Sequence, residues 1–281
     1  MSAPFSLLLP VYRGDDPAHF LKAVGSSTAE QTVRPAQLVL VQDGPVGEEL
    51  AEAIERAVAQ SPVPVTRHVF EENVGLATAL EHGLTLCAHD IVARMDADDI
   101  SLPERFAKQL PVIEAGADLV GTGMFEFLDD DGSIVARRTP RTGHEEISRY
   151  ARFHDPFSHP TVMYRRSAVA SAGGYRPLGL MEDYWLFARM IHAGARVENL
   201  ADPLVMYRVG AGAYARRGGR AQWRSELALQ KALRSIGFTT RWEYLRNVAV
   251  RGAYRFVPEP VRKIAYRRLI ANGGAAGPAG A

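Results

Sequence analysis

The sequence predicts an α/β fold, with a Rossmann-like, mainly parallel central sheet flanked by helices and a helical extension toward the C-terminal end. Two observations predict this class. Short apolar runs alternate with amphipathic helical patterns through the first half of the chain, which is typical of βα units. The 281 residues are 47% hydrophobic and 23% charged, and this length and composition suit one large globular domain with an appendage.

The repeating units can be bounded from the residue pattern. The expected strands cover 5–9, 37–41, 65–70, 91–95 and 119–123. The expected helices lie near 17–27, 48–59, 75–87 and 103–115. Asp16 followed by Pro17 supplies an N-cap and a first-turn proline for the first helix. Ser101 to Glu104 has the pattern of a capping box, which predicts a helix start there.

The pattern changes after residue 123. Apolar runs on either side of Asp129 to Gly132 predict a hairpin over 125–136, with the three aspartates in a solvated turn rather than in a metal site. A strand at 161–164 and a helix at 182–193 follow. The Gly-, Ala- and Pro-rich tail, 272–281, is expected to be disordered.

Charge and cysteine content exclude several classes of protein. The formal net charge of +1 gives no overall bias toward nucleic acid or acidic partners. The single cysteine, Cys87, cannot form an internal disulfide or a zinc cluster, so we expect a buried thiol and a reducing, cytoplasmic setting. No secretory leader and no run of membrane-spanning length is found. Any membrane role would then be peripheral, at the inner face of the cell membrane.

Three carboxylates, Asp96, Asp98 and Asp99, follow directly on the apolar strand 91–95. The strand end releases them into a loop where two carboxylates can point at one site. Hard oxygen ligands suit Mg²⁺ or Mn²⁺, and such sites leave the remaining coordination to water and to a ligand's phosphates. The alternative is an acidic turn before a helix, and spacing alone does not decide between the two.

Polar residues follow each of the first four strands at the same edge of the predicted sheet, where ligands bind in open parallel sheets. They are Pro10 to Arg13, Gln42 to Gly44, Glu71 to Gly75 and Asp96 to Asp99. The sequence lacks both the P-loop and the glycine fingerprint of dinucleotide-binding proteins, so a nucleotide would be held through a metal. This layout points to group transfer from a metal-bound nucleoside diphosphate.

With these motifs the chain resembles glycosyltransferase family 2, inverting enzymes of GT-A fold that use nucleoside-diphosphate sugars. The matching segments extend in order over residues 5–210. They are Leu9 to Tyr12, Gln42 to Gly44, Glu72 to Ala77, Met95 to Asp99 as the family's Asp-x-Asp, Ser158 to Met163, Gly173 to Tyr175 and Glu182 to Leu186. The ending from Tyr207 to Gly219 is most similar to the bacterial exopolysaccharide-type transferases.

The resemblance implies a binding role for residues on the first three loops. Pro10, Tyr12 and Asp43 would hold uracil or another base, with Asp43 accepting a hydrogen bond from a ring N–H. Asn73 and Gly75 would shape the loop under the nucleotide. A plain turn at Asp43 and a helix N-cap at Asn73 are the simpler alternatives.

The resemblance also assigns the fourth loop. Arg94, Asp96 and Ala97 would contact the nucleotide, with Arg94 beside it or paired with Asp96 or Asp98. Asp98, with Asp96, would bind Mn²⁺ or Mg²⁺, and His159 is a further candidate ligand. The simpler readings are an exposed strand arginine at Arg94 and a structural histidine at His159.

The acidic pair Glu182 and Asp183 opens a predicted helix. In this family the carboxylate of that pair removes the proton of the acceptor hydroxyl, and Asp183 is the expected base. Without the Asp-x-Asp upstream, two acids at a helix start would be read as favourable partners of the helix dipole. Arg216, Arg217 and Arg220 could close over the donor diphosphate as a lid or form a solvated basic loop.

The C-terminal part is basic: between Lys231 and Arg268 there are ten Lys or Arg residues against Glu243 and Glu259, interleaved with aromatic and aliphatic residues. Basic amphipathic helices of this kind suit the surface of an anionic membrane, where a lipid-linked acceptor would be found. A dimer contact or a helix packed on the catalytic domain explains the pattern equally well. Nucleic-acid binding lacks a recognised module.

The sequence therefore predicts a catalytic domain over 1–215, with a nucleotide-sugar half, 1–123, and an acceptor half, 124–215. A basic helical extension, 216–271, and the tail follow. The expected activity is inverting transfer of a sugar from a nucleoside-diphosphate donor, a UDP-sugar by family habit, to a glycan or lipid-linked acceptor. The alternatives are a sugar-phosphate nucleotidyltransferase and a non-catalytic glycan- or membrane-binding protein on the same scaffold. The sequence names neither the sugar nor the oligomeric state.

Overall fold

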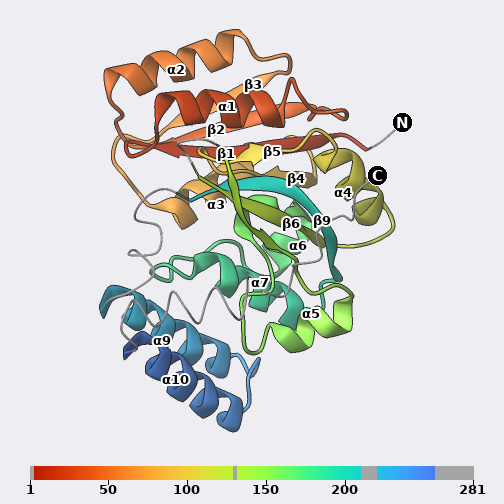
Figure 1. Cartoon of the computed structure of the whole chain (residues 1–281), viewed down its shortest axis with the longest axis vertical. Helices are drawn as coiled ribbons and strands as arrows, with labels where there is room; N and C mark the ends of the chain where they lie inside the picture. The colour runs from red at the N-terminus through yellow and green to blue at the C-terminus, as the bar shows by residue number, and fades with distance from the viewer. Residues whose placement is uncertain (1–2, 129–131, 210–219, 257–281) are drawn as a thin grey trace.

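The computed structural model describes residues 3–128, 132–209 and 220–256. One twisted sheet runs through it in the order β3-β2-β1-β4-β8-β6-β9-β5, with β7 paired to β6 (Figure 1). The strands are β1 Phe5–Tyr12, β2 Gln37–Asp43, β3 Val65–Val69, β4 Ile91–Arg94, β5 Ile100–Ser101, β6 Leu119–Phe127, β7 Ile134–Arg138, β8 Met163–Arg165 and β9 Val197–Arg208. The helices are α1 Pro17–Ser27, α2 Glu48–Ala59, α3 Leu76–Leu86, α4 Arg105–Glu114, α5 His144–Tyr150, the 3₁₀ turn η1 His159–Thr161, α6 Arg166–Ser171, α7 Glu182–His192, α9 Arg220–Ser235 and α10 Arg241–Phe256.

The first half of the sheet is parallel, as the sequence predicts. β1 pairs in parallel with β2 and β4, and β2 pairs in parallel with β3. The register sets Tyr12, at the end of β1, opposite Asp43, at the end of β2. The loops after these strands therefore leave from one edge of the sheet.

The second half of the sheet is mixed. β8 lies antiparallel between β4 and β6, while β6 and β9 are parallel. The strand predicted over 161–164 is present as β8 but begins two residues later, at Met163, because Thr161 belongs to the 3₁₀ turn η1. The predicted hairpin is confirmed by the antiparallel pairing of β6 and β7. Its turn aspartates, 129–131, lie outside the described residues.

Helices cover both faces of the sheet (Figure 1). On one face Phe20 of α1, Ile54 of α2 and Phe106 of α4 pack against the strands. On the other, Leu80 of α3 and Leu186 of α7 belong to a second core cluster. The alternating side chains of strands buried on both faces explain the continuous apolar runs in the sequence.

The predicted N-cap at Asp16 is confirmed, and the predicted capping box at Ser101 is wrong. Asp16 accepts the backbone N–H groups of Ala18 and His19 at 2.8 and 3.0 Å, as an N-cap should. The capping box over Ser101 to Glu104 does not form: Ser101 lies in β5, opposite Val205, and its hydroxyl accepts from Arg105 Nη1 at 3.0 Å. Strand pairing with β9 takes Ser101 out of the helix start.

Cys87 is buried, as predicted. Its thiol donates to the carbonyl oxygen of Gly83 at 3.3 Å, and burial raises its pKa to about 12. A thiol with such a pKa carries almost no thiolate at neutral pH, which agrees with a structural role.

The helices α9 and α10 form a pair at one end of the molecule (Figure 1). Leu229 and Leu233 of α9 share an apolar cluster with Tyr184 and Trp185 of α7, so α9 packs on α7. α10 is attached by polar contacts, among them an ion pair between Arg152 and Glu243 at 2.7 Å. Arg216 and Arg217 lie outside the described residues, as does the tail.

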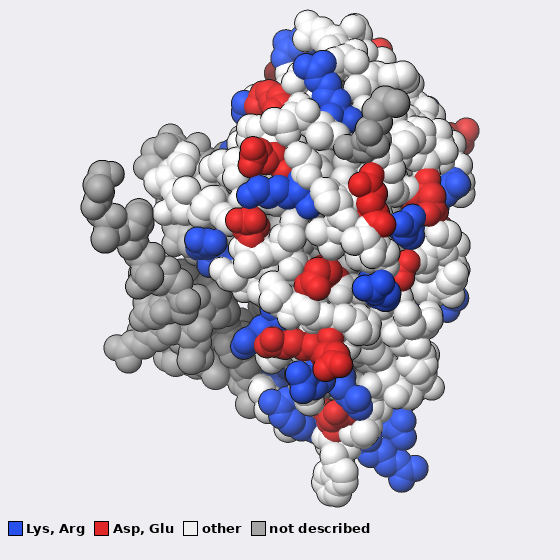
Figure 2. Space-filling model, turned by 90° about the vertical axis from the view of Figure 1, so that its right-hand side faces the viewer, with Lys and Arg blue, Asp and Glu red and all other residues white. Residues whose placement is uncertain are grey.

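The outer side of α10 carries apolar side chains. Trp242 is 80% exposed, and Leu245 and Val250 are more than half exposed. None of the described helices has the length and apolar character needed to cross a bilayer. On the face shown in Figure 2, basic and acidic side chains are interspersed and crowd together at the lower end, the level of α5 and α10 in Figure 1.

Candidate active site

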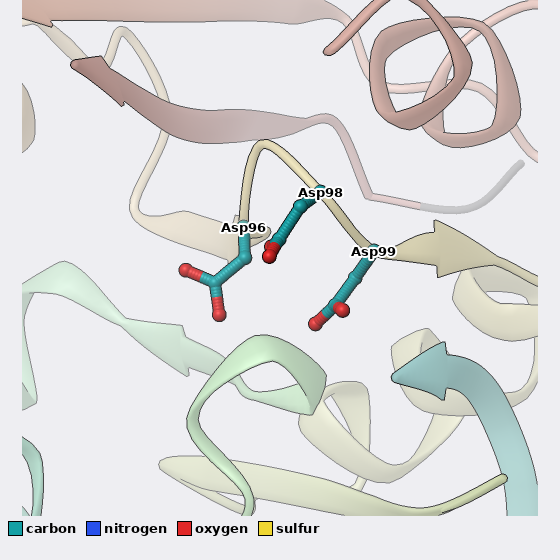
Figure 3. A group of neighbouring side chains, drawn as sticks. All are labelled: Asp96, Asp98 and Asp99. Atoms are coloured by element: carbon teal, nitrogen blue, oxygen red, sulfur yellow. The ribbon is translucent and has the colours of Figure 1, made fainter. Parts of the chain in front are cut away.

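Three carboxylates lie together in the loop between β4 and β5. The side chains of Asp96, Asp98 and Asp99 leave this loop on the same side (Figure 3), and each offers an oxygen within 4.8 Å of the others. Asp99 is fully buried: its Oδ1 accepts the backbone N–H of Arg208 at 2.9 Å, while Oδ2 has no hydrogen-bond partner among the described residues. A buried carboxylate oxygen left without a donor fits a metal ligand.

The pKa values around this loop reflect the crowding of negative charge. Burial, followed by repulsion from Asp96 and Asp98, raises the pKa of Asp99 well above its usual value. Burial and the Asp96 charge also raise the pKa of Asp98. Asp15 is also affected by these charges: burial raises its pKa to about 7. The hydrogen bond from the N–H of Tyr12 opposes this shift, and the charges of Asp98 and Asp96 add to it. A divalent cation would relieve this repulsion.

Neither Asp15 nor Asp99 was predicted to take part in the site. Asp99 belongs to the metal-compatible group, and Asp15 interacts with the charges of Asp98 and Asp96. Asp15 follows β1 at the edge where the other polar loops leave, which is the signal that could have found it. Its Oδ2 accepts the N–H of Tyr12 at 2.8 Å. Asp99 stood in the recognised motif, but only the pairing of β5 with β9 shows that its side chain turns inward.

Arg94 is almost completely buried at 1% exposure and forms an ion pair with Asp96. Although burial alone lowers the pKa of a guanidinium, the Asp96 carboxylate raises the pKa of Arg94 above its usual value. The predicted pairing with Asp96 is therefore confirmed, and the exposed strand arginine is excluded. Its Nε and Nη1 have no hydrogen-bond partner among the described residues.

The Asp43 carboxylate ties the second loop to the third. It accepts hydrogen bonds from Nδ2 of Asn73 and from the backbone N–H groups of Val74 and Gly75, at 2.9, 2.6 and 3.1 Å. Asn73 is thus not the N-cap of α3, a position that Gly75 takes. Gly44 lies between the loops with φ of 87°, and a Cβ there would come within 2.7 Å of the backbone nitrogen of Asn73.

The remaining predicted binding residues differ in exposure. Pro10 and Ala97 are buried, Pro10 inside β1 opposite Val41 and Ala97 in the apolar core. Tyr12 is 47% exposed at the end of β1. A Cβ at Gly14 would lie 2.5 Å from the Tyr12 hydroxyl, so the ring covers that glycine and leaves a face to solvent.

A pocket of about 880 Å³ opens beside the carboxylate group. Its lining includes Arg94, Asp96, His159, Glu182 and Asp183, and so joins the fourth loop to the start of α7. On a second wall, β7 and the segment after it contribute Arg137, Arg138 and Arg141. The predicted metal loop and the predicted base thus share one cavity.

Asp183 lies in the first turn of α7. Its Oδ1 accepts the N–H of Tyr184 at 2.7 Å, and Oδ2 lies 4.0 Å from Nδ1 of His159. Burial raises the pKa of Asp183, although the Tyr184 N–H and Arg94 oppose the shift. Burial also raises the pKa of Glu182, whose Oε2 has no hydrogen-bond partner in the described parts of the chain. A carboxylate with a raised pKa is a stronger base than an exposed one.

His159 is buried beside Asp183. Its Nε2 shares a hydrogen bond with the hydroxyl of Tyr175 at 2.9 Å. Burial and the charge of Arg94 hold the pKa of His159 well below its usual value, so the ring is neutral at neutral pH. It does not belong to the metal-compatible carboxylate group of the described residues. The structure therefore places His159 beside the predicted base, Asp183, at a separation longer than a hydrogen bond.

Comparisons with known proteins agree with this geometry. The family model of glycosyl transferase family 2 matches residues 6–173. The amylovoran biosynthesis glycosyltransferase AmsE of Erwinia amylovora is 35% identical, with the match covering 94% of this chain and 98% of the relative. A UDP-Gal:alpha-D-GlcNAc-diphosphoundecaprenol beta-1,3-galactosyltransferase of Escherichia coli is 29% identical over 95% of this chain and 96% of its own.

A solved structure shows the same fold at low sequence identity. It is the mannosyltransferase PcManGT of Pyrobaculum calidifontis in complex with GDP-Man and Mn²⁺. The TM-score is 0.58 at 17% identity, and the match covers 98% of this chain and 76% of the other. This likeness shows that the two chains share a fold.

Proposed function

This chain is a glycosyltransferase that belongs to glycosyl transferase family 2, and from that premise we propose the reaction it carries out. It moves a sugar from a nucleoside-diphosphate sugar, a UDP-sugar, to a glycan or lipid-linked acceptor in the synthesis of a cell-surface polysaccharide or glycolipid. The observation that carries the proposal is the shared pocket, which holds Asp96 of the carboxylate group and Asp183 of α7. The names of the Erwinia and Escherichia relatives support the acceptor class.

The donor binds across the ends of β1, β2 and β4. The exposed ring of Tyr12 stacks on the base, and the loop that Asp43 holds together lies under the nucleoside. Arg94 positions Asp96 through their ion pair. Asp96, Asp98 and Asp99 would hold Mn²⁺ or Mg²⁺. In this ligand set Asp99 replaces His159, which the sequence suggested as a further ligand. When bound, the cation supplies neutralisation of the charge that develops on the departing diphosphate.

The acceptor binds on the other side of the pocket. Oδ2 of Asp183 takes the proton of the acceptor hydroxyl, whose oxygen forms a bond to the anomeric carbon. The bond between that carbon and the diphosphate oxygen breaks, and the nucleoside diphosphate leaves with the electron pair. Attack from the face opposite the leaving group inverts the anomeric configuration. Glu182 assists from its place beside Asp183.

The domain division follows the same roles. Residues 1–215 are the catalytic domain, and 216–271 are an extension that brings the enzyme to its acceptor. The exposed Trp242 and Leu245 on α10, with the exposed Arg241 and Arg246 beside them, suit an anionic membrane surface at the inner face of the cell membrane.

Calorimetric titration tests the donor site. The protein is titrated with UDP, GDP and dTDP, each with Mn²⁺, with Mg²⁺ and with EDTA, beside the Asp98→Ala variant. Metal-dependent binding of UDP that disappears in Asp98→Ala is the expected result. Binding of GDP or dTDP instead would replace the donor class, and binding of no nucleotide by a folded protein would favour a non-catalytic scaffold.

A further inference from the structure

The second wall of the pocket carries cations that the donor site does not use. Arg94, Arg105 and Arg208 are cations whose charges interact with the carboxylate group. Arg137, Arg138 and Arg141 come from β7 and the segment that follows it, and they line the same pocket as Arg94. Several arginines on one wall of a pocket are typical of sites for planar anionic groups.

The three arginines are held in different ways. Arg138 forms an ion pair with the fully buried Glu126 and lies over the ring of Tyr207, so its charge is committed to the fold. Arg137 is exposed, and its side chain makes no hydrogen bond or ion pair with the described residues. An arginine that lines a pocket without a partner is available to a ligand.

Arg141 is held in position without being neutralised. Its guanidinium lies 5.9 Å from the centre of the Tyr150 ring, which in turn stacks on His154. Its backbone carbonyl accepts Nδ2 of Asn199 at 2.9 Å, which fixes the segment. The ion pair with Glu146 at 3.2 Å joins two side chains that are at least half exposed. Such a pair contributes little to stability, so a ligand can replace Glu146 as the partner of Arg141.

We propose that Arg137 and Arg141 bind a phosphate or diphosphate group of the acceptor, on the side of the pocket away from the donor's diphosphate. The proposal rests on the transferase function and deepens it, because it makes the acceptor a phosphate-linked sugar. Asp155 and Asp183 line the same pocket as this wall, and their charges influence each other. A sugar whose hydroxyl meets Asp183 therefore lies in the pocket that Arg137 and Arg141 also line.

The donor is the other source of a diphosphate, and the structure favours the acceptor. The donor's diphosphate belongs at the carboxylate group. There the buried Oδ2 of Asp99 has no hydrogen-bond partner among the described residues, which suits a cation that would bind the diphosphate. Asn199 Nδ2 donates to the carbonyl oxygens of both Arg141 and Pro156, at 2.9 and 3.1 Å, and so ties the Arg141 segment to the loop that leads to His159. Because His159 lies beside Asp183, this connection places Arg141 on the acceptor side.

The test is direct binding in the absence of transfer. Decyl diphosphate is titrated into the full chain in EDTA, and decyl glucoside serves as the probe that lacks phosphate. The expected result is that Arg137→Ala/Arg141→Ala raises the Kd for decyl diphosphate about 10- to 100-fold. Each charge-assisted contact contributes about a factor of ten to the affinity. Arg34→Ala/Arg56→Ala removes the same charge from exposed positions outside the pocket lining and leaves that Kd unchanged.

Further arms separate the two sources of diphosphate. The affinity for UDP with Mn²⁺ stays the same in Arg137→Ala/Arg141→Ala. An equal loss of UDP affinity would assign the arginines to the donor, and an unchanged Kd for decyl diphosphate, or equally tight binding of decyl glucoside, would overturn the proposal. Failure of UDP to bind the wild-type protein would refute the donor assignment while leaving the EDTA titration interpretable. Arg137→Lys/Arg141→Lys keeps the charge but not the bidentate geometry and gives an intermediate Kd.

Discussion

Replacing Asp99 by Asn tests whether the buried carboxylate group is built for a cation. The substitution removes one negative charge and keeps an acceptor for the N–H of Arg208. Two unit charges at the 4.8 Å limit of the group repel each other by about 3 kcal/mol at an effective dielectric constant of about 20. Arg94 offsets part of this through Asp96, so a net gain of about 1–3 kcal/mol is expected for the metal-free variant at alkaline pH.

The gain depends on pH in a defined direction. Because the pKa of Asp99 is raised in the folded protein, its contribution to stability is fully present below the unfolded pKa of about 4 and is lost as pH rises through the folded pKa. Asn mimics the protonated form at every pH. In EDTA the variant and the wild type should therefore melt together at acid pH, and the variant should melt higher at pH 8 to 9, by about 2 °C per kcal/mol.

Differential scanning fluorimetry with and without metal provides the assay. A cation at 100 times its Kd stabilises the wild type by about 2.7 kcal/mol, and most of this shift should disappear in Asp99→Asn. Asp202→Asn, which removes an exposed charge paired with Lys108, is the control and should leave the Mn²⁺ shift intact. A variant that melts below the wild type in EDTA at all pH values, and that keeps the full Mn²⁺ shift, would refute the reasoning.

Three further predictions concern the base, the loop contact and α10. Asp183→Asn should lower kcat about 10²- to 10⁴-fold while UDP with Mn²⁺ binds as before, measured by release of nucleoside diphosphate; loss of binding instead would make Asp183 a donor residue. Because the pKa of Asp183 is raised, kcat/KM of the wild type should fall with acidification at a pH above the usual aspartate value of about 4, and a flat profile down to pH 4 would contradict this assignment. Gly44→Ala should destabilise the protein by about 1–3 kcal/mol and weaken UDP binding, since its φ is positive and its Cβ meets Asn73, whereas Gly47→Ala, with open space around it, should be nearly neutral in thermal unfolding. Trp242→Ser/Leu245→Ser should reduce co-sedimentation with vesicles containing anionic phosphatidylglycerol, and Ile134→Ser, an equally exposed apolar site elsewhere, should not; equal binding by all variants would argue against α10 as the contact.

Much of the donor side could be predicted from sequence because it depends on local patterns. The apolar runs of β1, β2 and β4 mark the strands, and parallel pairing brings the residues after them to one edge. The convergence of Asp43 and Asn73 follows from this rule. Their hydrogen bond does not, because it depends on the positive φ of Gly44, which the sequence permits but does not require.

The acceptor side was harder to predict because it depends on contacts between distant segments. His159 was expected near the metal, yet the antiparallel insertion of β8 places it beside Asp183, which is 24 residues later in the chain by numbering and on another element. Asp99 turns inward because β5 pairs with β9, a contact between residues that lie about a hundred positions apart. Neither pairing has a signature in local hydrophobic periodicity.

The inverted direction of β8 has a consequence for how such enzymes can diversify. An antiparallel strand begins at the edge where its parallel neighbours end, so η1 and His159 reach the pocket that Asp96 also lines without a long connecting loop. The donor loops belong to residues before 100, whereas the arginine wall and Asp183 come from later segments of the chain. Mutation can therefore change the acceptor wall while the donor loops keep their shape, and recombination near residue 120 could exchange acceptor preference as a unit.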